Sequence, residues 1–360
     1  MNSKARFTTS SVTTKPNRPQ RPIGKRSCGK RRRANDKNLT EHADSRNKME
    51  SLYLSARIIT PICAAVLLGY ALRRLKLWDD HTVSQVNTIC FKVLFPIHLF
   101  ISVIHTDLSS TLDEKLLVAG VVCVFVIFFG TLGGCIIFVK EKRRLGALVQ
   151  GIFRGNTLLF GLPLVTTLYG DERAGVAALM IAVVIPVYNT LAVILLESCR
   201  GGRASLKKVL YGIVTNPLIV GTVTGLAGLL CGVHLPAIAD EAVMSITKIT
   251  TPLALLGLGG TFRFDAVGHN LRALFWAVFS RLILIPAILM PVVIALGFRE
   301  VTLAALLTIL VVPTAVNSFT MAQQMDSDAE LSGQIVVFTS LFSILSVFGW
   351  IFLLSHLGYL

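Results

Sequence analysis

Cationic and amide side chains occur in this sequence inside stretches that are otherwise apolar enough to lie in a lipid bilayer. Arg154 and Asn156 lie within the apolar run from about Leu145 to Tyr169. Asn317 lies within a second run, Val301–Met325. A guanidinium can bind a carboxylate through two parallel hydrogen bonds, and side-chain amides can donate further ones. These residue types therefore predict a binding site for a small anion.

Four cationic side chains lie at least six residues from either end of a predicted membrane span, and no acidic side chain there neutralises them: Lys92, Arg154, Lys248 and Arg281. A basic residue at a helix centre costs about 2.5–3.5 kcal/mol on insertion scales, so each needs an explanation. The lysines have a second interpretation, because long side chains can extend to the headgroups. Arg281 can instead serve helix packing, and Arg154 can cap backbone carbonyls that a helix break leaves free.

Both polar runs contain residues that interrupt a helix. The first reads FRGNTLLFGLPL over 153–164 and includes Pro163, and the second contains VVPTAVNSFT with Pro313. Proline removes a backbone donor and clashes with the preceding turn. Free backbone groups are tolerated in hydrocarbon only where they face protein or a water-filled cavity. Two interrupted helices at matching places predict the midplane site of a secondary transporter.

The composition is that of a helical membrane protein. Apolar residues make up 53% of the chain and charged residues only 15%, with a mean hydropathy of +0.68. Continuous apolar runs fit spanning helices and lack the alternation of a barrel strand. We predict an all-α protein with ten transmembrane helices at about 54–72, 83–104, 116–139, 145–169, 174–196, 209–231, 242–262, 273–296, 301–325 and 331–354.

The N-terminal tail, residues 1–48, is basic and poor in apolar residues. Residues 1–50 hold 14 Lys and Arg against four acids, which predicts disorder. In a soluble protein KRSCGKRRR would suggest nucleic acid or anionic lipid. In this membrane chain we expect no nucleic-acid partner. Met49 stands directly before the first apolar segment, so a third interpretation is that translation of the native protein begins there and the tail is not made.

The sequence contains no pattern of an enzyme or a metal site. Its seven cysteines include no C-x-x-C pair, its seven histidines no H-x-x-x-H pair, and no phosphate-binding loop is present. We therefore expect no cofactor, no catalysis and no pump driven by its own ATP hydrolysis. Asp and Glu lie only in the tail, in loops or at segment ends, which disfavours coupling to protons through an intramembrane acid. Coupling to a sodium ion that backbone carbonyls coordinate stays open.

The loops indicate an orientation in the cell (inner) membrane. Loops after predicted helices 1, 3, 5, 7 and 9 hold 13 Lys and Arg, and the remaining loops hold three. Positive loops face the cytoplasm, which places both termini outside. The basic tail argues for the opposite orientation, and this conflict weakens if translation begins at Met49.

Two motifs indicate an internal duplication. FKVLFP and TKITTP each place a lysine four residues before a proline, Lys92/Pro96 and Lys248/Pro252. Pro96 and Pro252 are 156 residues apart, and the prolines of the two interrupted runs are 150 apart. An odd number of helices per half inserts the second half upside down. The prediction is two inverted five-helix repeats, with residues 1–48 as tail, 49–197 as repeat 1, 198–208 as a basic cytoplasmic linker and 209–360 as repeat 2.

Six motifs in order resemble the auxin efflux carrier family, whose prokaryotic members include malate and malonate permeases. They are LGYALRR (68–74), LFPIHLF (94–100), GNTLLFGLPL (155–164), TNPLIVGTVTG (215–225), PLALLGLGG (252–260) and VPTAVNSFTMA (312–322). The resemblance runs from about Met49 to the C-terminus. It implies a scaffold domain, a moving transport domain, and predicted helices 4 and 9 crossing at their breaks. It places Asn156, Pro163, Pro313 and Asn317 at that crossing, with Asn189 as a further polar candidate.

The sequence thus predicts a permease for a small organic anion, a mono- or dicarboxylate such as malate or malonate. Predicted substrate-binding residues are Lys92, Arg154, Asn156, Pro163, Asn189, Lys248, Pro313 and Asn317. The expected partners are the carboxylate and the lipid bilayer, and a homodimer is left open. Two other classes stay open as well: an anion channel lined by the same breaks, and a membrane sensor that uses the basic tail to bind a partner.

Overall fold

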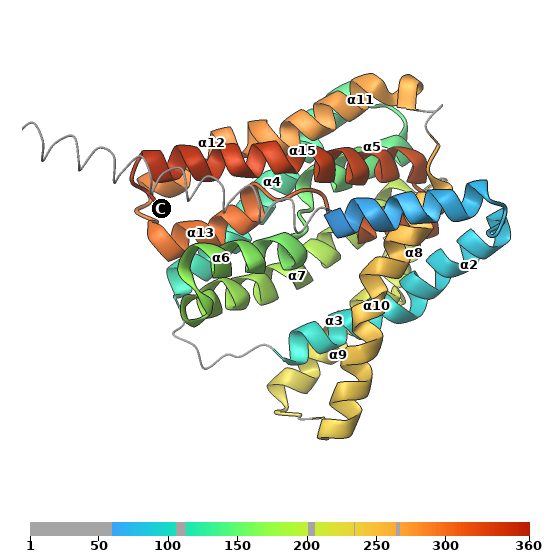
Figure 1. The fold of residues 1–360 in the computed structure, drawn as a ribbon, viewed down its shortest axis with the longest axis horizontal. Coiled ribbons are helices and arrows are strands. Elements are labelled where there is room, and N and C mark those ends of the chain that lie inside the picture. The colour runs from blue at the N-terminus through green and yellow to red at the C-terminus, as the bar shows by residue number, and fades with distance from the viewer. Residues whose placement is uncertain (1–59, 106–112, 201–205, 234, 264–266) are drawn as a thin grey trace, which may run out of the picture. The chain divides into compact units, whose positions relative to one another are not determined.

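The computed structural model describes residues 60–105, 113–200, 206–233, 235–263 and 267–360 (Figure 1). The predicted tail, the start at Met49 and most of the predicted linker lie outside these ranges. Besides a first helix over 60–74, the described elements are α2 (Asp80–Ile89), η1 (Cys90–Leu94), α3 (Phe95–Ile104), α4 (Glu114–Phe138), α5 (Lys142–Phe153), η2 (Thr157–Gly161), α6 (Leu162–Tyr169), α7 (Asp171–Cys199), α8 (Leu206–Val214), α9 (Pro217–Leu230), α10 (Ala237–Thr261), α11 (Val267–Phe279), η3 (Ser280–Leu284), α12 (Ile285–Ala295), α13 (Glu300–Leu310), α14 (Asn317–Gln324) and α15 (Ala329–His356).

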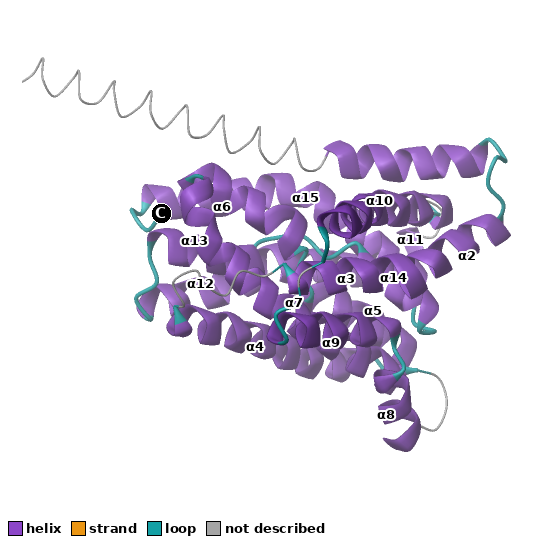
Figure 2. Cartoon of the chain, turned by 90° about the horizontal axis from the view of Figure 1, so that it is seen from below, coloured by secondary structure: helices purple, strands orange, loops and turns teal. Residues whose placement is uncertain are grey.

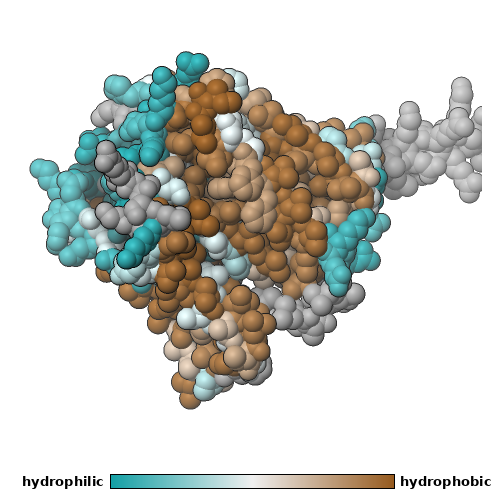
Figure 3. Space-filling model, turned by 180° about the vertical axis from the view of Figure 1, so that it is seen from behind, coloured by the Kyte–Doolittle hydropathy of each residue, from teal (hydrophilic) through white to brown (hydrophobic). Residues whose placement is uncertain are grey.

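Every named element in the described residues is a helix (Figure 2). Within the described ranges, six helices are long and apolar enough to cross a membrane: Asp80–Ile104, Glu114–Phe138, Arg173–Cys199, Ala237–Thr261, Val267–Ala295 and Ala329–His356. Only 22% of the apolar window of α4 is buried, so most of that helix shows an apolar surface. Figure 3 shows such residues across the middle of one face, with hydrophilic residues gathered towards its ends. The prediction of an all-helical chain with membrane-spanning helices is confirmed.

Three π-helical turns occur in the described residues, and each ends two residues before a proline. The turns η1, η2 and η3 are followed by Pro96, Pro163 and Pro286. Proline cannot donate to the carbonyl four residues back and its ring crowds that carbonyl. A wider turn takes up the mismatch without ending the helix. For this reason the chain is helical through Pro163, and the first interruption falls earlier, at Arg154–Asn156.

The predicted sixth span, 209–231, contains a helix boundary. Helix α8 ends at Val214 and α9 begins at Pro217. The Asn216 side chain accepts a hydrogen bond from the Leu218 backbone N–H at 3.0 Å, and Pro217 takes a first-turn position where its missing donor costs nothing. An N-cap residue followed by proline therefore starts a new helix inside one apolar run.

Two groups of helices are recognisable from their contacts. Helix α3 packs along α9 and against α10, low in Figure 1, while α5, α7, α11, α13, α14 and α15 pack among themselves. The α3–α9 contact is close because α9 offers glycines: a Cβ at Gly221 would lie 2.5 Å from the Pro96 carbonyl oxygen. Small residues let membrane helices approach in this way. The candidate site lies where the two groups face each other.

Candidate functional site

The two interrupted helices meet at their breaks. The first break, Arg154–Asn156, separates α5 from η2, and the second, 311–316, separates α13 from α14. Gly155 and Thr314 form an antiparallel bridge. The Asn156 N–H donates to the Pro313 carbonyl at 2.8 Å, and the Ala315 N–H donates to the Arg154 carbonyl at 3.1 Å. Backbone groups that the breaks free from helices therefore satisfy one another.

Arg281 fills the space at the C-terminal ends of α5 and α13. Its side chain is fully buried, and it donates to the carbonyls of Ile309 and Val312 at 2.8 Å each. Its Nη1 also lies 3.4 Å from the carbonyls of Ile152 and Phe153. Helix C-termini carry partial negative charge and unpaired carbonyls, and a guanidinium supplies both the charge and the donors. This is the packing role that the sequence left open for Arg281.

Two further residues allow this close arrangement. Gly155 has no side chain where a Cβ would overlap the Arg281 guanidinium and lie 2.9 Å from Val312. Thr314 donates through its hydroxyl to the Gly151 carbonyl at 2.6 Å, and its backbone N–H donates to the Thr339 hydroxyl at 3.2 Å. The junction of the breaks is thus packed and hydrogen-bonded from both sides.

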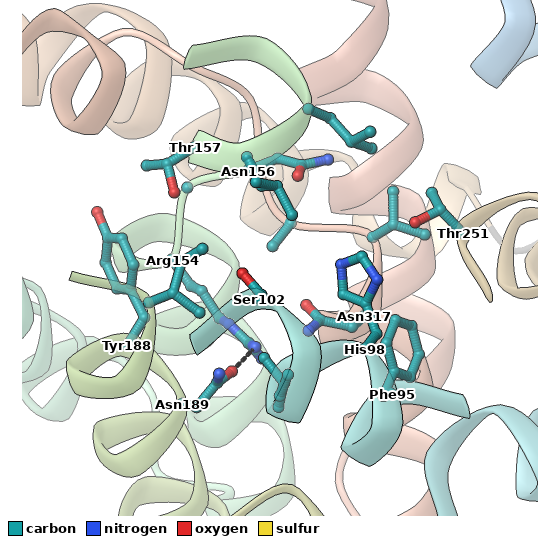
Figure 4. Close-up of a pocket in the computed structure, with 17 residues that line it drawn as sticks. Phe95, His98, Ser102, Arg154, Asn156, Thr157, Tyr188, Asn189, Thr251 and Asn317 are labelled. Carbon is teal, nitrogen blue, oxygen red and sulfur yellow. Dashed lines mark hydrogen bonds between the residues drawn. The ribbon is translucent and has the colours of Figure 1, made fainter. Parts of the chain in front are cut away.

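A cavity opens beside this junction, between the two groups of helices (Figure 4). The centre of a water-sized sphere can occupy about 70 Å³ of this cavity. By the same measure, one water molecule needs about 10–15 Å³. Its polar lining comes from both breaks and from α3, α7 and α10: His98, Ser102, Arg154, Asn156, Thr157, Tyr188, Asn189, Thr251 and Asn317. The space is sufficient for several waters or a small organic ion.

Arg154 reaches this cavity as a buried cation. Its side chain is only 3% exposed, and it donates to the Asn189 side-chain oxygen and contacts the Met321 sulfur. No ion pair joins it to a carboxylate in the part of the chain that the structure describes. It does not cap the carbonyls of the breaks, because Arg281 does so. Its positive charge thus lies at the cavity wall beside an amide and a thioether, with no described carboxylate to offset it.

The hydrogen bond to Arg154 fixes how Asn189 is turned. A guanidinium only donates, so Asn189 must direct its oxygen to Arg154 and keep its NH₂ away from it. That nitrogen is buried and has no partner. An unsatisfied buried donor costs about 1–3 kcal/mol, which a ligand with acceptor oxygens removes. Arg154 and Asn189 therefore form a pair that presents charge and N–H donors together.

The helix ends add to the positive character of the cavity. Residues 157–159, at the start of η2, and residues 315–317, at the start of α14, both line it. N-terminal N–H groups of helices carry partial positive charge and favour anions. The opposite ends, the C-termini of α5 and α13, are covered by Arg281. The partially positive helix N-termini thus lie at the cavity, and the partially negative helix C-termini lie at the guanidinium of Arg281.

The predicted site residues divide into two sets. Arg154, Asn156, Asn189 and Asn317 line the cavity, and the Pro313 carbonyl holds the junction beside it. Three others do not line it: Pro163, Lys92 and Lys248. Pro163 is half-buried on the first turn of α6, beyond the break, because the π-helical turn absorbs it. Both lysines are exposed on helix surfaces outside the cavity.

The sequence did not single out several residues of the cavity wall. His98 and Ser102 of α3 and Thr251 of α10 reach it from distant parts of the chain. The signal for His98 was its place in the LFPIHLF motif, two residues after Pro96. No group of three or more His, Cys, Asp or Glu that could hold a metal occurs in the described residues.

Comparison with known proteins decides the family. The model of a family described as membrane transport proteins matches residues 56–351. The chain belongs to this family. The resemblance to auxin efflux carriers is thereby confirmed, and the chain is an integral membrane transporter and not an enzyme.

Relatives of this transporter are distant in sequence and similar in length. An "Uncharacterized transporter" of Methanothermobacter thermautotrophicus is 24% identical over 304 residues, covering 82% of this chain and 97% of that protein. A "Putative malonate transporter" of Rhizobium meliloti is 22% identical over 305 residues, covering 82% and 95%. The "Uncharacterized transporter YfdV" of Escherichia coli is 24% identical over 247 residues, covering 64% and 76%.

Proposed function

We propose that this transporter is a permease for a small organic anion, a mono- or dicarboxylate of the malate or malonate type. The observation that carries the proposal is Arg154, a buried cation without a carboxylate partner that lines a cavity beside two helix breaks. The name of the Rhizobium meliloti relative supports the same substrate class. A carboxylate would receive charge and two N–H groups from Arg154 and a further N–H from Asn189.

The transport cycle that fits this site is alternating access around the junction of the breaks. We propose ten transmembrane helices in two inverted five-helix repeats, in which predicted helices 4 and 9 cross at Arg154–Asn156 and 311–316. The cavity lies between α3 and α10 on one side and the breaks with α7 on the other. A shift of one group against the other would expose it to one side of the membrane and then to the other. Both termini outside the cytoplasm and a homodimer stay predictions.

The position of Arg281 is an argument that anion transport does not involve a sodium ion bound at the junction. In transporters with broken helices, half-helix C-termini and unwound carbonyls are the groups that coordinate a coupling cation. Here the guanidinium of Arg281 donates hydrogen bonds to the carbonyls of Ile309 and Val312, which are therefore not free to coordinate a cation. The driving force would then be the gradient of the substrate or the membrane potential, by uniport or exchange.

Counterflow into proteoliposomes tests the proposal. Purified full-length protein is reconstituted with a high internal concentration of unlabelled malonate, malate or acetate, and uptake of the labelled compound is followed. The proposal expects saturable uptake that internal substrate stimulates and that is independent of sodium. Single-channel currents in planar bilayers without counterflow would instead establish an anion channel, the second class. Uptake of an organic cation such as choline with no response to any carboxylate would refute the anion proposal.

A further inference from the structure

A second cavity lies at the other end of α14, away from the junction of the breaks. The centre of a water-sized sphere can occupy about 130 Å³ of it. The end of α10, the second half of α14 and the first turns of α15 enclose it. Its polar lining is Thr261, Arg263, Gln323, Glu330 and Gln334. The Lys and Arg count predicts that this end faces the cytoplasm.

A chain of hydrogen bonds fixes the orientation of one amide in this wall. Arg144 Nη2 donates to Asn270 Oδ1 at 3.0 Å. Because a guanidinium cannot accept, the Asn270 oxygen must face it, and Asn270 Nδ2 then donates to Gln334 Oε1 at 3.0 Å. This bond uses the oxygen of the Gln334 amide, so only its nitrogen Nε2 is left to interact with other groups. Arg144 thus determines, through Asn270, that Gln334 offers a donor to its surroundings.

That donor has no partner among the residues that the structure describes. Gln334 is 1% exposed and its Nε2 is a buried nitrogen without a hydrogen bond. The Oε1 of Gln323, in the same wall, also has none. No hydrogen bond in the described part of the chain fixes the Gln323 amide, so its rotation can bring a second NH₂ to the cavity. A buried donor without a partner is costly, and an acceptor oxygen placed beside it would remove that cost.

We propose that this second cavity binds the carboxylate group of a small organic acid, held by the Gln334 amide inside and by Arg263 at the rim. The proposal rests on the proposed function, because the ligand is of the class that the central cavity would take. Glu330 also lines the wall, but it is exposed, so solvent screens its charge; its Oε1 lies 3.4 Å from Asn270 Nδ2. The Gln334 donor is buried away from solvent, and it is the contact that Gln334→Leu removes.

The two cavities are successive positions along one helix pair. On α14 Asn317 lines the central cavity and Gln323 the second, six residues on, which is about 9 Å of helix. On α10 Thr251 lines the central cavity and Leu258 lines the second, seven residues further on, which is about 10 Å of helix. A carboxylate at the second cavity would thus lie about two helical turns from the central cavity. It would occupy this position on its way from solution to the central cavity, or on its way out.

Equilibrium binding of radiolabelled malonate to the purified full chain in detergent tests the proposal. Wild type should bind at two classes of site. Gln334→Leu, which removes the donor, should weaken one class about tenfold or more and leave the other. Asn270→Asp should do the same without altering the cavity wall, because its second carboxylate oxygen would accept from Gln334 Nε2 and turn the Gln334 oxygen outward. Ser332→Ala, on the same helix and outside the wall, is the matched control and should bind like wild type.

The outcomes separate this inference from the proposed function. If Arg154→Gln removes all malonate binding, or if Gln334→Leu and Asn270→Asp bind like wild type, only water occupies the second cavity and the inference is refuted while carboxylate transport stands. If proteoliposomes transport no carboxylate and Gln334-dependent binding persists, the second site stands and the proposed function fails. A folding defect in Gln334→Leu is recognised by its thermal transition in detergent, and Gln334→Glu, of equal size with acceptors only, then replaces it and should weaken the same class.

Discussion

Replacing Arg281 by methionine should loosen the junction of the two breaks. The guanidinium makes two bonds of 2.8 Å to the carbonyls of Ile309 and Val312, and two of 3.4 Å to those of Ile152 and Phe153. Hydrogen bonds to a charged group contribute about 1.5–3 kcal/mol each, so the two short bonds together amount to roughly 3–6 kcal/mol. Removing a buried cation also removes its desolvation cost, which makes this figure an upper limit.

Hydrogen exchange followed by mass spectrometry measures the local effect. A local loss of about 3 kcal/mol corresponds to roughly 100-fold faster exchange through opening. Peptides that cover 150–160 and 308–318 should show it, whereas peptides from α4 should not. Arg281→Lys keeps the charge without the fork and should lie between the two. Arg272→Met, at an exposed arginine of the neighbouring helix α11, is the matched control. Unchanged exchange at both breaks in Arg281→Met would refute the role of the guanidinium as their cap.

Three further predictions concern glycine, proline and lysine positions. Gly155→Ala should lower both protein level and transport because its Cβ would overlap the guanidinium, whereas Gly130→Ala, with nothing within 4 Å, should be neutral in the same immunoblot and uptake assay. Pro313→Ala should reduce counterflow several-fold at near-normal protein level, since alanine lets the non-helical segment at 311–316 return to helix; wild-type uptake would contradict this. Lys92→Gln and Lys248→Gln should change the KM for malonate less than twofold, because both side chains are exposed outside the cavity, and a tenfold rise for either would return it to the site.

The sequence predicted the helical class and the two interrupted segments, because apolar length and helix-breaking residues are local properties. It predicted the place of the first break less well. Proline at 163 was the strongest breaker in the run, but a π-helical turn accommodates it, and the chain leaves the helix at Arg154–Asn156 instead. Which of two solutions a proline takes depends on tertiary packing, which sequence pattern does not contain.

Roles that depend on contacts between distant segments were beyond the sequence. Arg281 and Arg154 look alike as cations in apolar runs, yet one meets the C-termini of α5 and α13 and the other meets an amide and a cavity. Only the approach of segments that lie 28 to 167 residues apart in the sequence separates them. The wall residues His98 and Thr251 are hidden for the same reason, because their place in the wall depends on how α3 and α10 pack against the breaks.

The most direct test of the central claim is the apparent affinity of Arg154→Gln for a carboxylate in counterflow, measured beside Arg154→Lys and wild type. If Arg154 binds the substrate, Arg154→Gln should raise the KM for malonate about tenfold or more, because a charge and a two-pronged donor are lost together. Arg154→Lys, which keeps the charge alone, should fall between the two. Arg154→Gln protein of normal abundance that transports malonate with wild-type KM would contradict the claim that this buried cation is the anion site.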